Sequence, residues 1–218
     1  MYIVENKKMV FVHMNKCAGV TVKDYLVSTH GAKICKYKHA PLRMLPEKYY
    51  KYKKIGVIRN PFSWYVSYYT YYRKSGYMTT IGFDEFIKTY TQHPRALLDR
   101  MGNKIRNKWE NLYPPKTKMP VGAFTFYYIN YFCFNSRKIL QNWNIEELKE
   151  KFDGMADIDY MMRTETLEED MNNLFGSNNA KKKNVSNTKP YQEFYTPELK
   201  KLVEDKERII LDYYGYKY

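Results

Sequence analysis

The chain has 218 residues, a length typical of one domain with one core. Hydrophobic residues make up 44% of it and aromatic residues 17%, a composition that excludes a disordered chain. Lysine and arginine number 37 against 23 acidic residues, and the resulting charge of +14 predicts an anionic partner. The same charge also fits a solvated, lysine-rich surface with no specific partner.

The patterns of cysteine, histidine and apolar residues exclude further classes. The three cysteines form no CxxC pair and the four histidines no HExxH pattern, so we expect neither a disulfide framework nor a metal site. No apolar run approaches the roughly 18 residues of a membrane span. The N-terminal residues carry charges where a signal peptide would be apolar. We therefore expect a cytoplasmic protein without a membrane span.

Short apolar runs alternate with helix-compatible stretches along the chain. The predicted strands are 9–14, 32–37, 54–59 and 158–163. The predicted helices are 20–28, 62–74 with Pro61 in the first turn, 83–90, 126–134, 145–152, 167–174 and 197–213. A loop is expected at 176–189, and 94–122 shows no readable pattern. This alternation predicts one α/β domain over 1–218, with a central, mostly parallel sheet flanked by helices.

The segment His13–Thr21 links the first predicted strand to the first predicted helix. A strand, a tight turn containing Gly19 and a helix start would direct backbone N–H groups and the positive helix end at one spot. Lys16 adds a full charge and Thr21 a hydroxyl, so the segment predicts an anion cradle. A triphosphate-binding loop would place its lysine directly after the second glycine. Lys16 precedes Gly19 instead, which disfavours a kinase or an ATPase.

A second motif follows the strand predicted at 54–59. This strand ends in Arg59, Pro61 begins a helix, and Ser67 lies two turns inside that helix. Arg59 can bind a phosphate group with two hydrogen bonds, and Ser67 can add a hydroxyl from the same side. The alternative is that Arg59 forms a structural salt bridge and Ser67 packs within the helix. Two successive anion sites indicate a ligand with two separate phosphate groups.

These two motifs resemble those of sulfotransferases that use 3′-phosphoadenosine 5′-phosphosulfate (PAPS), especially the carbohydrate branch with its viral and bacterial members. His13–Thr21 is similar to the family's 5′-phosphosulfate loop, His-x-Pro-Lys-Thr-Ala-Gly-Thr, and departs from it at Asn15, Cys17 and Val20. Arg59 with the later serine is similar to the family's 3′-phosphate motif. The resemblance implies a three-layer, P-loop-like fold. It also implies nucleotide contacts from Lys16, Cys17, Ala18, Gly19, Val20, Thr21, Arg59 and Ser67.

The resemblance continues through the C-terminal third. The segment Asp159–Glu165 is similar to the family's late strand, and its two end residues are expected to orient groups rather than to catalyse. Lys181–Lys183 falls where the family carries a basic loop over the nucleotide, which implies contacts from Lys182 and Lys183. Segment 191–216 is similar to the family's closing helix.

The reaction that the resemblance implies is in-line transfer of a sulfuryl group from PAPS to an acceptor hydroxyl, without a metal. Lys16 would balance charge on the bridging oxygen. His39 is the predicted general base, because it follows the second predicted strand, which in such folds lies beside the first loop. Lys36 and Lys38 would favour its neutral imidazole. His39 could instead bind substrate or cap a turn, and His13 is the second candidate for the base.

The acceptor stays open at this point. The basic surface would suit an acidic substrate and the aromatic content would suit stacking on a sugar, but neither excludes a tyrosine side chain, a lipid or a small alcohol. A saccharide is expected because the His-x-x-Lys-x-Ala-Gly form of the loop resembles the carbohydrate branch, and we expect no nucleic acid. Three alternatives also stay open: a P-loop-type kinase or nucleotide transferase, an inactive relative that only binds its ligand, and a nucleic-acid-binding module. The last would use the tyrosines of segment 68–72 for base stacking. The oligomeric state is undetermined.

Overall fold

A computed structural model describes residues 1–76, 78–92, 119–142, 144–153, 155–176 and 189–218. The chain divides into two compact units, each made of discontinuous segments. The first comprises Met1–Arg59, Tyr128–Ser136 and Gly154–Asn187, and the second comprises Asn60–Tyr127, Arg137–Asp153 and Thr188–Tyr218. The single domain over 1–218 stays a prediction. Most of 94–122 and of the loop expected at 176–189 lies outside the described residues.

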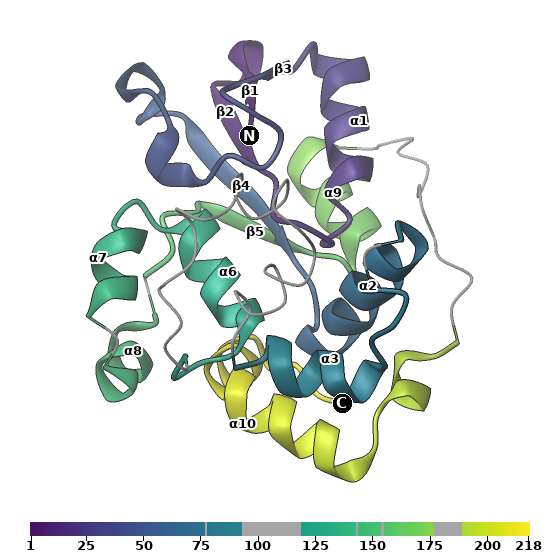
Figure 1. Ribbon diagram of the computed structural model, residues 1–218. Coiled ribbons are helices and arrows are strands. Elements are labelled where there is room, and N and C mark those ends of the chain that lie inside the picture. The colour runs from purple at the N-terminus through teal and green to yellow at the C-terminus, as the bar shows by residue number, and fades with distance from the viewer. Residues whose placement is uncertain (77, 93–118, 143, 154, 177–188) are drawn as a thin grey trace. The chain divides into compact units, whose positions relative to one another are not determined.

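A five-stranded sheet forms the centre of the first unit (Figure 1). The strands lie in the order β3 (Lys33–Ile34), β1 (Tyr2–Val4), β2 (Met9–Val12), β4 (Lys53–Ile58) and β5 (Tyr160–Arg163). β2, β4 and β5 pair in parallel, whereas β1 is antiparallel to both of its neighbours, so four of the five strands run in one direction. Every residue of β2 and the last four of β4 are buried, as expected for parallel strands. The predicted α/β fold with a mostly parallel sheet is confirmed.

The N-terminal edge of the sheet differs from the prediction. β1 was not expected, because three residues are too few to show a strand period. A short turn with Lys8 in the left-handed region (φ 47°) returns the chain, and β1 and β2 form a hairpin in which Ile3 lies opposite Val10. The strand predicted at 32–37 shortens to β3, which pairs with β1. The second predicted strand is therefore not the neighbour of β2.

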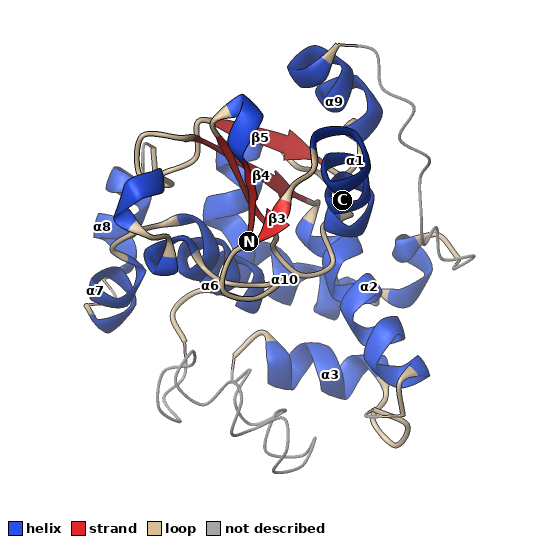
Figure 2. Ribbon diagram, turned by 90° about the horizontal axis from the view of Figure 1, so that it is seen from above, coloured by secondary structure: helices blue, strands red, loops and turns tan. Residues whose placement is uncertain are grey.

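Two helices of the first unit pack together next to the sheet. α1 (Gly19–His30) lies beside α9 (Leu167–Phe175), and the rings of Tyr25 and Phe175 meet with centroids 5.3 Å apart (Figures 1 and 2). Gly31 caps the C-terminal end of α1, and its left-handed backbone (φ 65°) directs its N–H to carbonyl groups of the last turn. Both helices were predicted to within about two residues, the usual uncertainty of a helix end.

Most helices of the second unit follow the predicted pattern. Its described residues include α2 (Pro61–Lys74), α3 (Phe83–Tyr90), α8 (Ile145–Lys151) and α10 (Pro197–Tyr214). The division between the units falls within α6 (Ala123–Phe132) and α7 (Ser136–Gln141), and α7 was not predicted. Pro61 begins α2, and the Asn60 side chain accepts a hydrogen bond from Phe62 N at 3.0 Å. Within the described residues, no helix is both long and apolar enough to cross a membrane.

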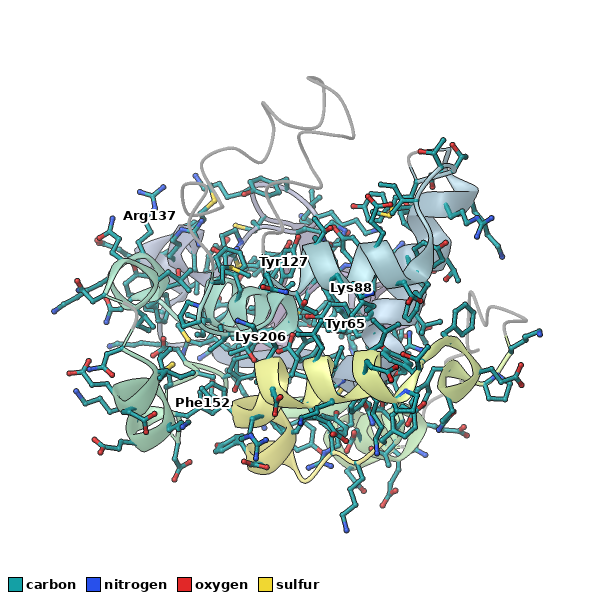
Figure 3. All side chains as sticks on the ribbon, turned by 60° about the horizontal axis from the view of Figure 1, so that its bottom comes forward. Tyr65, Lys88, Tyr127, Arg137, Phe152 and Lys206 are labelled. Atoms are coloured by element: carbon teal, nitrogen blue, oxygen red, sulfur yellow. The ribbon has the colours of Figure 1, made fainter. Side chains whose placement is uncertain are left out.

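A fully buried carboxylate organises the core of the second unit. Glu207 of α10 accepts hydrogen bonds from the hydroxyl of Tyr65, a residue labelled in Figure 3, from Phe124 N (3.0 Å), and from both N (2.9 Å) and Oγ1 (2.7 Å) of Thr125. The two backbone donors belong to the first turn of α6, where N–H groups have no partner within the helix. Burial raises the pKa of Glu207, and these donors oppose that effect. A Cβ at Gly122 would lie 2.0 Å from Oε1, so only glycine fits there.

We expect Glu207→Ala to lower the free energy of unfolding by about 3 kcal/mol or more, because several buried donors would lose their acceptor. The matched control is Glu204→Ala on the same helix, whose carboxylate is partly exposed and forms a surface ion pair with Lys200 at 3.3 Å. That change should cost less than about 1 kcal/mol. Urea denaturation followed by circular dichroism measures both. Equal losses would show that the Glu207 network does not stabilise the unit.

Candidate functional site

The site is built where three parallel strands end. β2, β4 and β5 are neighbours in the sheet and run in the same direction, so their carboxyl ends lie at one edge. Open α/β sheets bind ligands at this edge. The loop 13–18 follows β2, Arg59 follows β4, and Thr164 follows β5. The Thr164 hydroxyl donates to Ile58 O at 2.8 Å and ties the ends of β4 and β5 together.

The loop after β2 has an unusual backbone. Lys16 (φ 64°) and Ala18 (φ 52°) both adopt the left-handed conformation, which costs a non-glycine residue about 1–3 kcal/mol. Ala18 is the N-cap of α1 and has no side chain that could cap the helix. Residues strained in this way cluster at ligand clamps, and left-handed turns bring successive N–H groups to one side. The backbone therefore has the form that an anion cradle requires.

Two cations meet at this loop. Arg59 Nη1 donates to the backbone carbonyl of Lys16 at 3.4 Å. The pKa of Lys16 is lowered to about 8, first by burial and then by the positive charges of Arg59 and Lys38. An anion bound at the loop would relieve this repulsion. The two cationic residues that the sequence placed in separate motifs are thus brought together at one place in the first unit.

The remaining loop side chains contribute less charge. Cys17 is fully buried, and its Sγ lies 3.5 Å from Asn15 O as a donor. Burial raises the pKa of this thiol well above its usual range, so it stays neutral. Thr21 is buried and its N–H donates to Ala18 O at 3.0 Å. Any contact of Cys17 with a phosphate group is therefore expected from its backbone, in agreement with the loss of a hydroxyl there.

His13 is the first residue of the loop, and it is buried. Its side chain is 2% exposed and stacks on Phe11, with ring centroids 5.6 Å apart. Burial, followed by the charges of His39 and Lys38, lowers the pKa of His13 to about 2, so the ring is neutral at physiological pH. A Cβ at Gly19 would lie 2.2 Å from His13 Cδ2. Glycine at this position is required by the His13 ring rather than by the backbone angles.

His39 is attached to the same loop. Its Nδ1 lies 2.9 Å from the backbone carbonyl of His13, and its ring meets the His13 ring edge-on at 4.4 Å. A carbonyl oxygen only accepts hydrogen bonds, so Nδ1 carries the proton and Nε2 carries the lone pair of the neutral ring. This is the tautomer that a general base acting through Nε2 needs. Although β3 lies at the sheet edge, the segment after it returns His39 to the end of β2.

A family model described as the sulfotransferase family matches residues 1–210. The chain belongs to the sulfotransferase family. Its members transfer sulfuryl groups, and the α/β fold with a mostly parallel sheet fits the P-loop-like fold that the resemblance implied. No significant match was found among curated proteins or among solved structures. Of the alternatives that the sequence left open, a kinase and a nucleic-acid-binding module are disfavoured by this membership.

Other predicted residues of this sulfotransferase belong to the second unit or lie outside the described residues. Ser67 is a half-buried residue of α2 in the second unit, and its action together with Arg59 stays a prediction. Lys182 and Lys183 are outside the described residues. Tyr68 and Tyr69 are buried in an aromatic core, which weakens the argument for base stacking, whereas Tyr71 is exposed.

The late strand contributes structure more than chemistry. Asp159 accepts a hydrogen bond from Lys54 N at 2.6 Å and so ties β4 to the start of β5. Glu165 is exposed and is close enough to act electrostatically on Cys17. The sequence indicates a role for Lys38 only as a neighbour of His39, yet the charge of Lys38 also acts on Lys16. In the sequence, the position of Lys38 next to His39 is the one indication that Lys38 lies near the loop.

The lowered pKa of Lys16 predicts how anion binding depends on pH. Lys16 is charged below its pKa of about 8 and neutral above it, and an anion favours the charged form. The affinity for adenosine 3′,5′-bisphosphate should therefore fall above pH 8, by at most about tenfold per pH unit. The phosphate groups, with second pKa values near 6, change little there. Calorimetry between pH 7 and 9.5 measures the slope.

Lys16→Arg is the control for this pH dependence, because arginine stays charged throughout the range. The variant should bind with an affinity that is nearly constant from pH 7.5 to 9.5, whatever its absolute value. A wild-type affinity that does not change over this range would show that Lys16 does not contact the anion through its charge.

Proposed function

We propose that this sulfotransferase moves the sulfuryl group of PAPS to a hydroxyl group of a saccharide. The observation that carries the proposal is the joining of three groups at the end of β2: the strained Lys16 loop, Arg59 on the loop carbonyl, and His39 on the carbonyl of His13. These groups supply an anion cradle, a second cation and a base, which are the parts that the reaction needs.

The donor would be held by the two motifs. The N–H groups of the loop, with Lys16 and Thr21, suit the 5′-phosphosulfate, and Arg59 with Ser67 suits the 3′-phosphate. The left-handed residues of the loop and the neutral Cys17 leave backbone N–H groups as the main donors there. The residues present therefore fit a nucleotide that carries two separate anionic groups.

The chain's own residues supply proton transfer and charge stabilisation. His39 Nε2 would take the proton of the acceptor hydroxyl as the new oxygen–sulfur bond forms. The bond from sulfur to the phosphate oxygen of the nucleotide breaks, and Lys16 would balance the negative charge that develops on this oxygen. The leaving group is adenosine 3′,5′-bisphosphate, so atoms and charge balance without another reactant.

A saccharide acceptor is supported by the surroundings of His39. Lys36, Tyr37 and Lys38 precede it and are exposed. Cations suit a carboxylate- or sulfate-bearing sugar, and an exposed tyrosine ring suits stacking on a sugar face. The resemblance to the carbohydrate branch points to the same class of acceptor.

The donor site is tested by calorimetry with adenosine 3′,5′-bisphosphate, with ATP as the competing ligand. Wild-type protein should bind the bisphosphate at micromolar concentrations and ATP far more weakly. Arg59→Ala should lower the affinity by about tenfold to a hundredfold, because a charge-assisted contact to phosphate is lost. The matched control is Arg208→Ala, which removes an exposed arginine paired with Asp205 at 2.9 Å and should leave the affinity unchanged.

The proposal fails at its base if neither nucleotide binds, or if ATP binds more tightly than the bisphosphate. If the bisphosphate binds as expected, the acceptor is sought with labelled PAPS and a panel of neutral, carboxylated and sulfated saccharides. Transfer to a tyrosine peptide or to a small alcohol, with none to any saccharide, would keep the donor assignment and reject the acceptor class.

The role of His39 gives a separate prediction. His39→Ala should lower kcat by at least about a hundredfold, because the proton acceptor is lost, while the affinity for the bisphosphate stays within about threefold. His30→Ala is the matched control: His30 lies at the other end of α1, about 16 Å along the helix axis from Gly19. Its kcat should match that of wild type. Equal kcat values for His39→Ala and wild type would remove His39 from the mechanism.

A further inference from the structure

His13 has contacts that its expected part in the loop does not explain. Its ring is buried, and among the described residues its Nδ1 has no hydrogen-bond partner. A buried polar atom without a hydrogen-bond partner costs free energy. Another property of the imidazole must therefore offset this cost. Desolvation keeps the ring neutral, which argues against a charge as that property.

The property that remains is the shape and position of the ring. One part of it, Cδ2 and Nε2, lies so close to Gly19 that no side chain fits there. The same ring meets the ring of His39 edge-on, with centroids 4.4 Å apart. The His13 carbonyl holds Nδ1 of His39 at 2.9 Å. A single residue thus contacts both the first residue of α1 and the expected base.

The strand behind it holds this ring in place. Phe11 stacks on His13 with an interplanar angle of 23°, and Tyr2 of β1 is next to it, with ring centroids 6.4 Å apart. Phe11 and His13 are two residues apart and so point to the same side of an extended chain. These two neighbours restrict the movement of the ring.

We propose that His13 is a positioning residue that sets the donor loop and the base His39 in one fixed relation, through the contacts of its ring and of its carbonyl. The proposal goes beyond the assignment of His39 as base. Only its second half, which concerns the position of His39, rests on the proposed function. The half that concerns Gly19 holds whether or not the protein transfers a sulfuryl group. A ring of similar size should replace the imidazole, whereas a proton-transferring His13 could not be replaced in this way.

The first test is a double-mutant cycle that needs no activity. Gly19→Ala should weaken the binding of adenosine 3′,5′-bisphosphate by about tenfold or more in wild type, because the new Cβ collides with the ring. In a His13→Ala background the same change should weaken binding by less than about threefold. Equal effects in the two backgrounds would overturn the contact between His13 and Gly19. If the bisphosphate does not bind at all, the proposed function fails, and thermal unfolding of the four proteins still measures the coupling.

The second test separates positioning from proton transfer. His13→Ala should lower kcat about tenfold or more, because the base loses one of its supports, with a smaller change in KM for the acceptor. His13→Phe should restore kcat to within about threefold of wild type and leave the pH profile of kcat unchanged. A His13→Phe protein that binds bisphosphate normally but is as inactive as His39→Ala would overturn the proposal in favour of His13 as the base. If His13→Phe also loses the binding of the bisphosphate, the double-mutant cycle of Gly19→Ala and His13→Ala decides whether the proposal stands.

Discussion

The parallel pairing of β2 with β4 is the constraint on which the site depends. It sets the ends of two buried strands side by side, so that residues 43 positions apart in the chain, Lys16 and Arg59, share one hydrogen bond. Each strand alone would end in an ordinary turn. Together they bring two cations to the edge where open α/β sheets bind anions. Burial, and after it the charge of Arg59, lowers the pKa of Lys16, and a bound anion would favour its charged form.

Burial gives the three ionisable residues of the loop region different states. Cys17 and His13 are held neutral by desolvation, whereas the half-buried Lys16 keeps its charge at neutral pH. The loop therefore combines one lysine charge and a set of backbone N–H groups with the neutral side chains of Cys17 and His13. The proton on Nδ1 of His39 is fixed by a backbone carbonyl, which leaves the lone pair on Nε2. These states follow from position rather than from residue type, since a histidine or a cysteine in water would titrate much nearer to neutral pH.

The second unit shows the same dependence on burial in a structural role. Glu207 would read in the sequence as one more charge of an amphipathic helix, in a run with several lysines and acidic residues. It is fully buried instead and caps the first turn of α6 from another helix. Most aromatic residues of α2 likewise form a core, since Trp64, Tyr65 and Tyr68 are buried, whereas Tyr71 is exposed. The burial of Glu207 does not follow from local spacing, because it depends on partners far away in the chain.

The sequence by itself determined most helices, the parallel strands and the two motifs that we propose to bind anions, because hydrophobic periodicity, Pro61 and the loop pattern are local signals. It also supplied the family resemblance that the family match confirms. Tertiary structure alone decided that β1 separates β3 from β2, that His39 still reaches the loop, and that the His13 ring requires glycine at position 19. These outcomes depend on contacts between residues distant in sequence. Such contacts leave no periodic trace, because they are set by packing and desolvation in the folded chain.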